Sequence, residues 1–154
     1  MADKGNGLNK GEKTRFLLLD TAERLFGQNG VTATSLREVM KVADVNMAMV
    51  HYYFKNKEGL LDAILERRLV PINRDRLNLL GKYALEAEGR PIGMENIIRA
   101  YVEPFIRLCD NADKGGADFL KLFAWLRMEP NFTYHQLMKK HLGDSLAVFQ
   151  KELK

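Results

Sequence analysis

The stretch from Thr34 to Leu60 (TSLREVMKVADVNMAMVHYYFKNKEGL) constrains the fold most, because its pattern requires two short helices joined by a tight turn. The first helix is predicted over residues 35–42, where apolar residues recur at i, i+3 and i+4 and form one face. These apolar residues are Leu36, Val39 and Met40. Thr34 or Ser35 can cap the start of this helix, since a hydroxyl oxygen can accept a hydrogen bond from a free N–H group.

The second short helix has only one edge that can be buried. Asp44 lies in the turn before it and tolerates a left-handed backbone, and Asn46 is the expected cap. The buried edge consists of Val50, Tyr53 and Phe54. The residues with no core to enter are Met47, Ala48, Met49, His51 and Tyr52. A short helix that exposes small, apolar and aromatic groups is typical of helices that enter the major groove of DNA.

The rest of the chain predicts further helices and no strand. A helix is expected over residues 12–29, with Gly30 as its C-terminal stop, and another follows the cap Asn56. Pro71 either kinks that later helix or begins a new one. Three more helices are expected over residues 94–109, 117–128 and 134–153. The helix over 117–128 is apolar nearly all round and is expected in the centre of a bundle. The predicted class is all-α.

Three parts follow from this order of elements. Residues 1–11 are predicted to be a polar tail, residues 12–56 a three-helix module, and residues 57–154 a larger helical domain. The tail is either a solvated end or an arm that places Lys4 and Lys10 near DNA phosphates.

Composition does not indicate nucleic-acid binding, but it does indicate the cellular compartment. The net charge of the 154 residues is only +4, with +2 in residues 1–60 and +2 in residues 61–154, so charge by itself would not predict DNA binding. Cys109 is the single cysteine, so an intramolecular disulfide is excluded and a buried, unreactive thiol is expected. No apolar run is long enough for a membrane span and no signal peptide is present, so a soluble cytoplasmic protein is expected.

Enzymatic chemistry finds no support in the pattern of reactive residues. His51, His135 and His141 are not at metal-ligand spacing, and no glycine-rich phosphate loop follows a strand. We therefore expect no catalytic site, no metal and no cofactor.

Two stretches resemble a known family. VNMAMVHYYFKNKEGLL is similar to the signature that closes the helix-turn-helix of the tetracycline-repressor (TetR) family, and TRFLLLDTAERLFGQNGVTATSLREV resembles its first helix and the approach to its second. The similarity covers residues 14–63 without a gap, and the remainder is compatible with the family's divergent C-terminal domain. The resemblance implies a ligand-responsive repressor that binds a palindromic operator as a homodimer and is released by a small-molecule effector.

The resemblance also implies which residues contact DNA. Residues that would face base edges are Met47, Ala48 and Met49. Residues that would lie at phosphates or near the start of either short helix are Thr34, Ser35, Arg37, Asn46, His51, Tyr52 and Lys57. A helix N-terminus beside Lys57 would add free N–H groups to the same phosphate.

The sequence departs from the family in the helix that reads DNA. His51 replaces the usual Tyr, which would make its contact weaker or dependent on pH. Met47 and Met49 leave no bidentate reader of guanine or adenine, so readout would use thymine methyl groups, DNA shape and Arg37. Plain packing is the alternative role for both methionines. Tyr53 is expected inside and Tyr52 on the surface.

In the family an inducer binds between the later helices, and this places a pocket in residues 57–154. Candidate wall residues are Tyr101, Phe105, Phe119, Phe123, Trp125 and Met128. The alternative for each is ordinary core. Family members are usually longer and dimerise through two last helices, so the chain is expected to be a fragment, the ordered part of a longer protein, or a short member that dimerises differently. The alternative function is a helical small-molecule-binding or interaction module with a weak or vestigial DNA-binding head.

Overall fold

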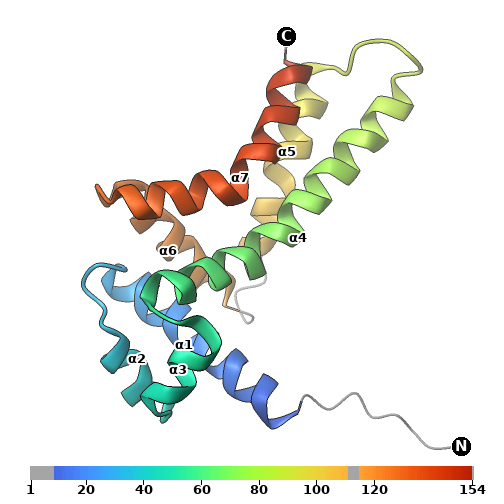
Figure 1. Ribbon diagram of the computed structural model, residues 1–154. Helices are drawn as coiled ribbons and strands as arrows, with labels where there is room; N and C mark the ends of the chain where they lie inside the picture. The colour runs from blue at the N-terminus through green and yellow to red at the C-terminus, as the bar shows by residue number, and fades with distance from the viewer. Residues whose placement is uncertain (1–8, 111–114, 154) are drawn as a thin grey trace, which may run out of the picture.

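The computed structural model describes residues 9–110 and 115–153, which form seven helices and no strand (Figure 1). The helices are α1 Lys10–Asn29, α2 Leu36–Ala43, α3 Met47–Phe54, α4 Lys57–Glu86, α5 Met94–Asp110, α6 Gly116–Met128 and α7 Phe132–Glu152. The predicted all-α class is therefore confirmed. Most of the predicted tail and the side chain of Cys109 lie outside the described residues.

Side-chain caps start five of these helices where the sequence places a Ser or Asn. The cap residues are Asn9, Ser35, Asn46, Asn56 and Asn131. Asn9 and Glu12 bind each other's backbone N–H groups at 2.9 and 2.8 Å, which completes a reciprocal capping box. This box starts α1 at Lys10, two residues before the predicted start.

The helix α4 is continuous over 30 residues and joins the two ends of the molecule (Figure 1). Pro71 lies inside α4 and is exposed, so its ring projects toward solvent rather than into a neighbouring helix. A new helix at Pro71, one of the two predicted alternatives, is therefore wrong. We call α1–α3 the head and α4–α7 the body.

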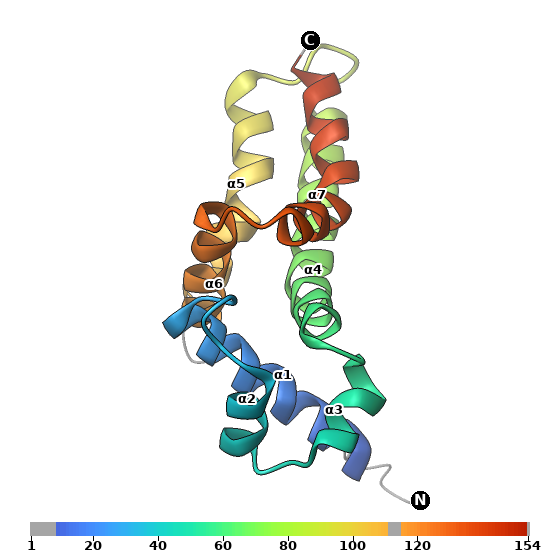
Figure 2. The same cartoon turned by 60° about the vertical axis from the view of Figure 1, so that its left-hand side comes forward.

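Some helices of the body lie far from the head, and others lie against it. In Figure 1, α5 lies beside the far half of α4, whereas α6 lies next to α1. The helix α7 bends sharply, so that its first half crosses near α6 and its second half runs toward the far end beside α4 and α5 (Figures 1 and 2). Gly143 is the one glycine or proline within α7, and helices commonly bend at such residues.

One continuous core joins the head to the near part of the body. Leu18 and Phe26 of α1 are fully buried in the same cluster as Phe119 and Leu122 of α6. A Cβ on Gly27 would lie 2.5 Å from the backbone oxygen of an α6 residue, so the two helices approach as closely as glycine permits. A three-helix head alone would bury little surface, and α4 and α6 supply the missing contacts.

The position predicted for α6 in the centre of a bundle is wrong. Its buried side packs on α1, while Trp125 and Met128 on other sides are 38% and 76% exposed. The far end of the body has its own small core of Leu80, Ile97, Ala100 and Phe149. In the part of the chain that the structure describes, no helix is long and apolar enough to cross a membrane.

A polar contact fastens α7 to the near half of α4. Asp62 of α4 accepts hydrogen bonds from Lys140 Nζ at 2.7 Å and pairs with His141 Nε2 at 2.6 Å. Burial acts to raise the pKa of Asp62, but the hydrogen bonds from Lys140 and His141 outweigh it, so the pKa lies below its ordinary value of 3.8. The ionised Asp62 therefore stabilises the folded chain.

This contact predicts how stability depends on acid. Because the folded pKa lies below the unfolded one, the contribution of Asp62 is present above about pH 3.8 and is lost as the pH falls through the folded pKa. We expect Asp62→Asn to lower the free energy of unfolding at neutral pH and to lessen its fall on acidification. Urea denaturation between neutral pH and pH 3 would measure both effects, with the exposed Asp144→Asn on α7 as the control. Parallel pH profiles for all three proteins would contradict this role.

Candidate nucleic-acid interface

Two eight-residue helices and a left-handed turn form the exposed end of the head. Asp44 ends α2 with φ 54° and ψ 47°, the left-handed conformation that the sequence predicted for this turn. Val39 of α2 and Val50 and Phe54 of α3 are buried against α1 and α4. Burial of these edges orients the remaining surface of α3 outward.

The outward edge of α3 carries the residues that the sequence left without a core. Ala48, His51 and Tyr52 are exposed, whereas Met47 and Met49 are half-buried. The residues predicted at base edges therefore all keep some exposed surface.

The two adjacent tyrosines separate as predicted. Tyr52 is 78% exposed, and its ring contacts that of Tyr53 edge-on at 4.9 Å between centroids. Tyr53 is half-buried and reaches the first turn of α1, where a Cβ on Gly11 would lie 2.9 Å from the tyrosine hydroxyl. Tyr53 thus supports the orientation of α3, while the Tyr52 hydroxyl is available to another molecule.

His51 closes the C-terminal end of α3. Its Nδ1 lies 2.6 Å from the carbonyl oxygen of Lys55, a residue held at φ 68°. Because a carbonyl oxygen only accepts, we assign the proton to Nδ1, which leaves Nε2 of the neutral ring as an acceptor. Neutral His51 therefore cannot donate to a phosphate, and only the imidazolium form has a second N–H to offer.

Two of the predicted phosphate residues are engaged within the head. Thr34 is fully buried and donates through Oγ1 to the carbonyl oxygen of Gly30 at 2.8 Å, so its side chain is not open to DNA and that prediction is wrong. Lys57 donates through Nζ to the carbonyl oxygens of Val31 and Thr34 at 2.8 and 3.0 Å. Lys57 thus anchors the connector between α1 and α2, and its contact with a phosphate stays a prediction.

The other polar residues of the predicted interface divide into caps and a free cation. Ser35 Oγ accepts from the N–H group of Glu38 at 3.1 Å, and Asn46 Oδ1 accepts from that of Met49 at 3.0 Å. Both side chains therefore cap the first turn of a short helix, and each oxygen is engaged by a backbone N–H group of its own helix. Arg37 is exposed and forms no ion pair among the described residues.

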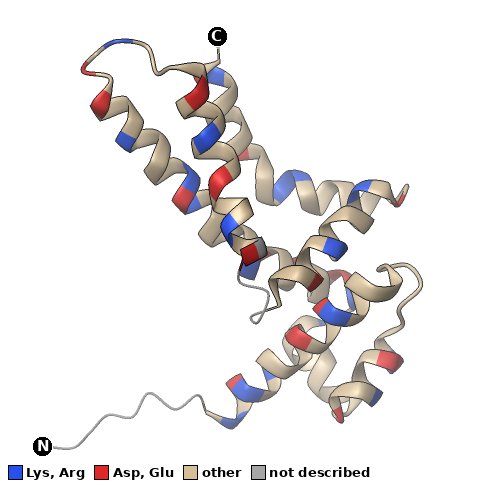
Figure 3. Cartoon of the chain, turned by 180° about the vertical axis from the view of Figure 1, so that it is seen from behind, with Lys and Arg blue, Asp and Glu red and all other residues tan. Residues whose placement is uncertain are grey.

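Charge does not mark out this surface. In the view of Figure 3, Lys and Arg alternate with Asp and Glu along the described helices of both head and body, and they form no continuous basic stripe on the described part of the head. The local shape and the side chains of α3 distinguish this end of the molecule, whereas its electrostatic potential does not.

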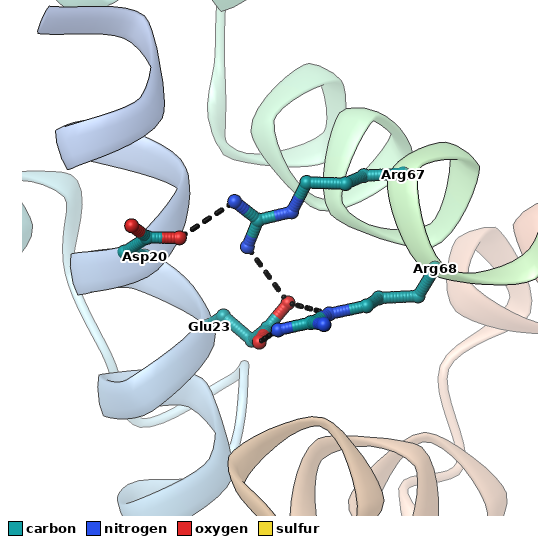
Figure 4. Close-up of polar contacts among 4 residues, drawn as sticks. All are labelled: Asp20, Glu23, Arg67 and Arg68. Carbon is teal, nitrogen blue, oxygen red and sulfur yellow. Dashed lines mark hydrogen bonds and ion pairs between the residues drawn. The ribbon is translucent and has the colours of Figure 1, made fainter. Parts of the chain in front are cut away.

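A buried ion-pair network joins the head to the body, and sequence reasoning missed it. Glu23 of α1 is 2% exposed and pairs with both Arg67 and Arg68 of α4, while Asp20 pairs with Arg67 at 2.6 Å (Figure 4). Gly115 covers the network closely, because a Cβ there would lie 2.9 Å from Glu23 Oε1. A sequence signal existed, since Glu23 interrupts the apolar stripe of α1 at helical spacing.

In the body, three of the six predicted pocket residues share a hollow. Tyr101, Phe105 and Phe123 line a central hollow of about 350 Å³ between α4, α5, α6 and α7. The other three lie elsewhere, and their role as pocket walls stays a prediction. Phe119 is fully buried in the core, Trp125 donates to the carbonyl oxygen of Gly27 at 3.2 Å, and Met128 is exposed. Arg76 and Arg127 also line the central hollow and were not predicted.

Family models match both parts of the chain. The model of bacterial regulatory proteins of the tetR family matches residues 18–64, and that of the tetracyclin repressor-like C-terminal domain matches residues 99–154. The first match contains α2 and α3 whole, and the second contains α6 and α7 as far as they are described.

Curated relatives are transcriptional regulators. The probable regulator YttP of Bacillus subtilis is 44% identical over 52 residues, which are 34% of this chain and 25% of YttP. The regulator AcrR of Shigella flexneri is 36% identical over 59% of this chain and 40% of AcrR. The repressor NemR of Escherichia coli is 30% identical over 72% of this chain and 53% of NemR. The matches thus span about half or less of these relatives.

Solved structures share the fold. A complex of SmeT with triclosan superposes with a TM-score of 0.62 at 21% identity, over 86% of this chain and 60% of SmeT. A mutant of HlyIIR superposes with a TM-score of 0.60 at 22% identity, over 93% of this chain and 72% of HlyIIR. At this level of identity the likeness concerns the fold alone.

Proposed function

Because the chain belongs to the TetR family of bacterial regulatory proteins, we propose that it is a DNA-binding transcriptional regulator and not an enzyme. The observation that carries this proposal is the outward edge of α3, where Ala48, His51 and Tyr52 are exposed beside the half-buried Met47 and Met49. A short, projecting helix of this kind can enter the major groove.

The finer proposal is a repressor that acts as a homodimer on a palindromic operator in the cytoplasm. Two helix-turn-helix heads must lie about 34–36 Å apart to read successive major grooves on one side of DNA. One head would therefore bind one half-site of the operator. A small-molecule effector would bind in the central hollow of the body and release the DNA.

Continuous packing between the central hollow and the head supports the proposal that a ligand in the hollow changes the position of α3. The helix α4 begins beside α3 and carries Arg76 of the central hollow further along the same helix. Arg67 and Arg68 lie between these points and hold Glu23 of α1. A change in the direction of α4 would therefore move α1 and α3 together, which is how a ligand with different affinities for two states shifts DNA binding.

Selection of bound sequences from a random DNA pool tests the proposal, first with the unaltered chain. We expect enrichment of a palindrome. Binding of small molecules without any enriched sequence would favour the alternative, a helical binding module with a vestigial head.

Two substitutions on α3 separate base reading from phosphate contact. We expect Met47→Ala to change the ranking of selected operators, because the thioether packs on base edges such as thymine methyl groups. We expect Tyr52→Phe to weaken binding to every operator by a similar factor, roughly 2–10-fold, because it removes one hydroxyl hydrogen bond and no packing. Fluorescence anisotropy with a panel of operators would measure both at one fixed salt concentration.

Met128→Ala is the matched control for Met47→Ala, since Met128 is exposed on α6, which belongs to the body. The assigned roles are contradicted if Met47→Ala changes the affinity for all operators by the same factor, or if Tyr52→Phe changes the order of the operator affinities.

A further inference from the structure

The central hollow holds a buried cation. Arg76 of α4 is 5% exposed, and its guanidinium lies on the face of Tyr101 with 3.9 Å between its central carbon and the ring centroid. Burial lowers the pKa of Arg76, with Tyr101 acting in the opposite direction, but an arginine stays protonated at physiological pH. A positive charge therefore lies at the wall of a hollow whose other walls are mostly apolar.

The partners of Arg76 are neutral. Its Nε donates to the carbonyl oxygen of Tyr101 at 2.7 Å and its Nη1 to Asn73 Oδ1 at 3.2 Å. Within residues 9–110 and 115–153, no carboxylate pairs with Arg76 and no hydrogen bond uses its Nη2. Burial of a charge is costly unless an opposite charge compensates it, and here dipoles and a ring face provide only part of that compensation.

A second cation lies at the rim. Arg127 of α6 is exposed, forms no ion pair among the described residues, and lines both the central hollow and a neighbouring outer hollow of about 470 Å³. The outer hollow adds Lys139 and His135. None of the described Asp or Glu residues lines either hollow, so their polar lining is selectively basic.

The other walls of the central hollow are flat and apolar. Phe105 and Phe123 pack with ring centroids 5.1 Å apart, and Val102 and Leu142 complete the apolar surface. The volume of about 350 Å³ lies near the lower end of the range for small-molecule sites, about 300–1,000 Å³. This space suits a ligand with a compact ring system rather than a long chain.

We propose that the central hollow binds an aromatic carboxylate, with its ring against Phe105 and Phe123 and its carboxylate between Arg76 and Arg127. The inference rests on the proposed effector site and names the chemistry of its ligand. Arginine N–H groups pair with carboxylates through short, charge-assisted hydrogen bonds, and a carboxylate here would neutralise the buried charge of Arg76. An uncharged analogue of the same shape would keep the ring contacts and lose that pairing.

Binding of 2-naphthoate and of 2-naphthamide to the whole chain tests the proposal by isothermal titration calorimetry. We expect the acid to bind at least about tenfold more tightly than the amide, as the loss of one charged hydrogen bond implies. Arg127→Gln should remove most of this preference, because it takes away one cation without disturbing any internal contact. Arg74→Gln is the matched control, since Arg74 is exposed on the same helix as Arg76 and lines neither hollow. It should leave both affinities within twofold.

Three results would overturn the proposal: no binding of the acid, equal binding of acid and amide, or an equal loss of preference in Arg127→Gln and Arg74→Gln. The titration contains no DNA, so it is independent of the proposed regulatory function. Tight binding of 2-naphthoate with unchanged operator affinity would support the anion site and count against an effector role for it.

Discussion

Glu23→Gln is expected to lower the free energy of unfolding by about 3 kcal/mol, as removal of one partner from a buried ion pair does. Glu23 is 2% exposed and is the carboxylate that Arg67 and Arg68 share (Figure 4). The amide keeps the shape but removes the negative charge, which leaves two poorly solvated guanidinium groups facing each other. Urea denaturation followed by circular dichroism would measure the loss.

Asp20→Asn is the control for this prediction. Asp20 pairs with the same Arg67, but its side chain is 68% exposed, so its loss should cost no more than about 1 kcal/mol. Equal costs for the two substitutions would show that burial does not govern the strength of this network. Because Glu23 belongs to the head and both arginines to the body, its loss should also loosen the connection between the outward edge of α3 and the central hollow.

Gly59→Ala is expected to destabilise the chain by about 1–3 kcal/mol, the usual cost of forcing extra atoms into a packed site. A Cβ on Gly59 would approach the carbonyl oxygen of Phe54 closer than 3.0 Å and would lie 3.3 Å from Oδ1 of the cap Asn56. The closest obstacle is backbone, which cannot rotate away as a flexible side chain does. Relief of this clash requires a shift of the turn between α3 and α4.

The same shift should disturb DNA binding, because the turn sets the direction of α3. Gly81→Ala is the matched control on α4, where a Cβ would meet nothing within 4 Å. It should stabilise the chain by about 0.5–1 kcal/mol through the better helix propensity of alanine. Thermal unfolding and operator binding of both variants would test the contrast, and equal behaviour of the two would contradict the role given to Gly59.

Periodicity and caps predicted the elements well because both are local effects. The spacing of Val50 and Phe54 decides which edge of α3 is buried, and Asn46 decides where the helix begins. The same spacing predicted Tyr53 to be more buried than Tyr52, and Tyr53 is half-buried against the core whereas Tyr52 is exposed. Such signals act over three or four residues, so a linear sequence contains them in full.

Side-chain partners distant in sequence could not be predicted in this way. Lys57 matches a family position, but its ammonium group meets carbonyl oxygens 23 and 26 residues earlier in the chain. Trp125 is of a residue type that often lines pockets, yet its indole N–H donates a hydrogen bond to the carbonyl oxygen of Gly27 in α1. Every residue has the same main-chain carbonyl group, so the sequence does not reveal which carbonyl accepts a given hydrogen bond. An apolar side chain suits a core and a pocket equally.

By itself, therefore, the sequence determined the all-α class, the helix-turn-helix and the outward edge of α3, since helix periods and caps depend on neighbouring residues. Tertiary structure alone decided that α6 packs on the head, that Glu23 meets Arg67 and Arg68, and that Arg76 lies at a hollow. The physical reason is that burial and charge pairing depend on which helix faces come together, and several arrangements satisfy the same apolar stripes.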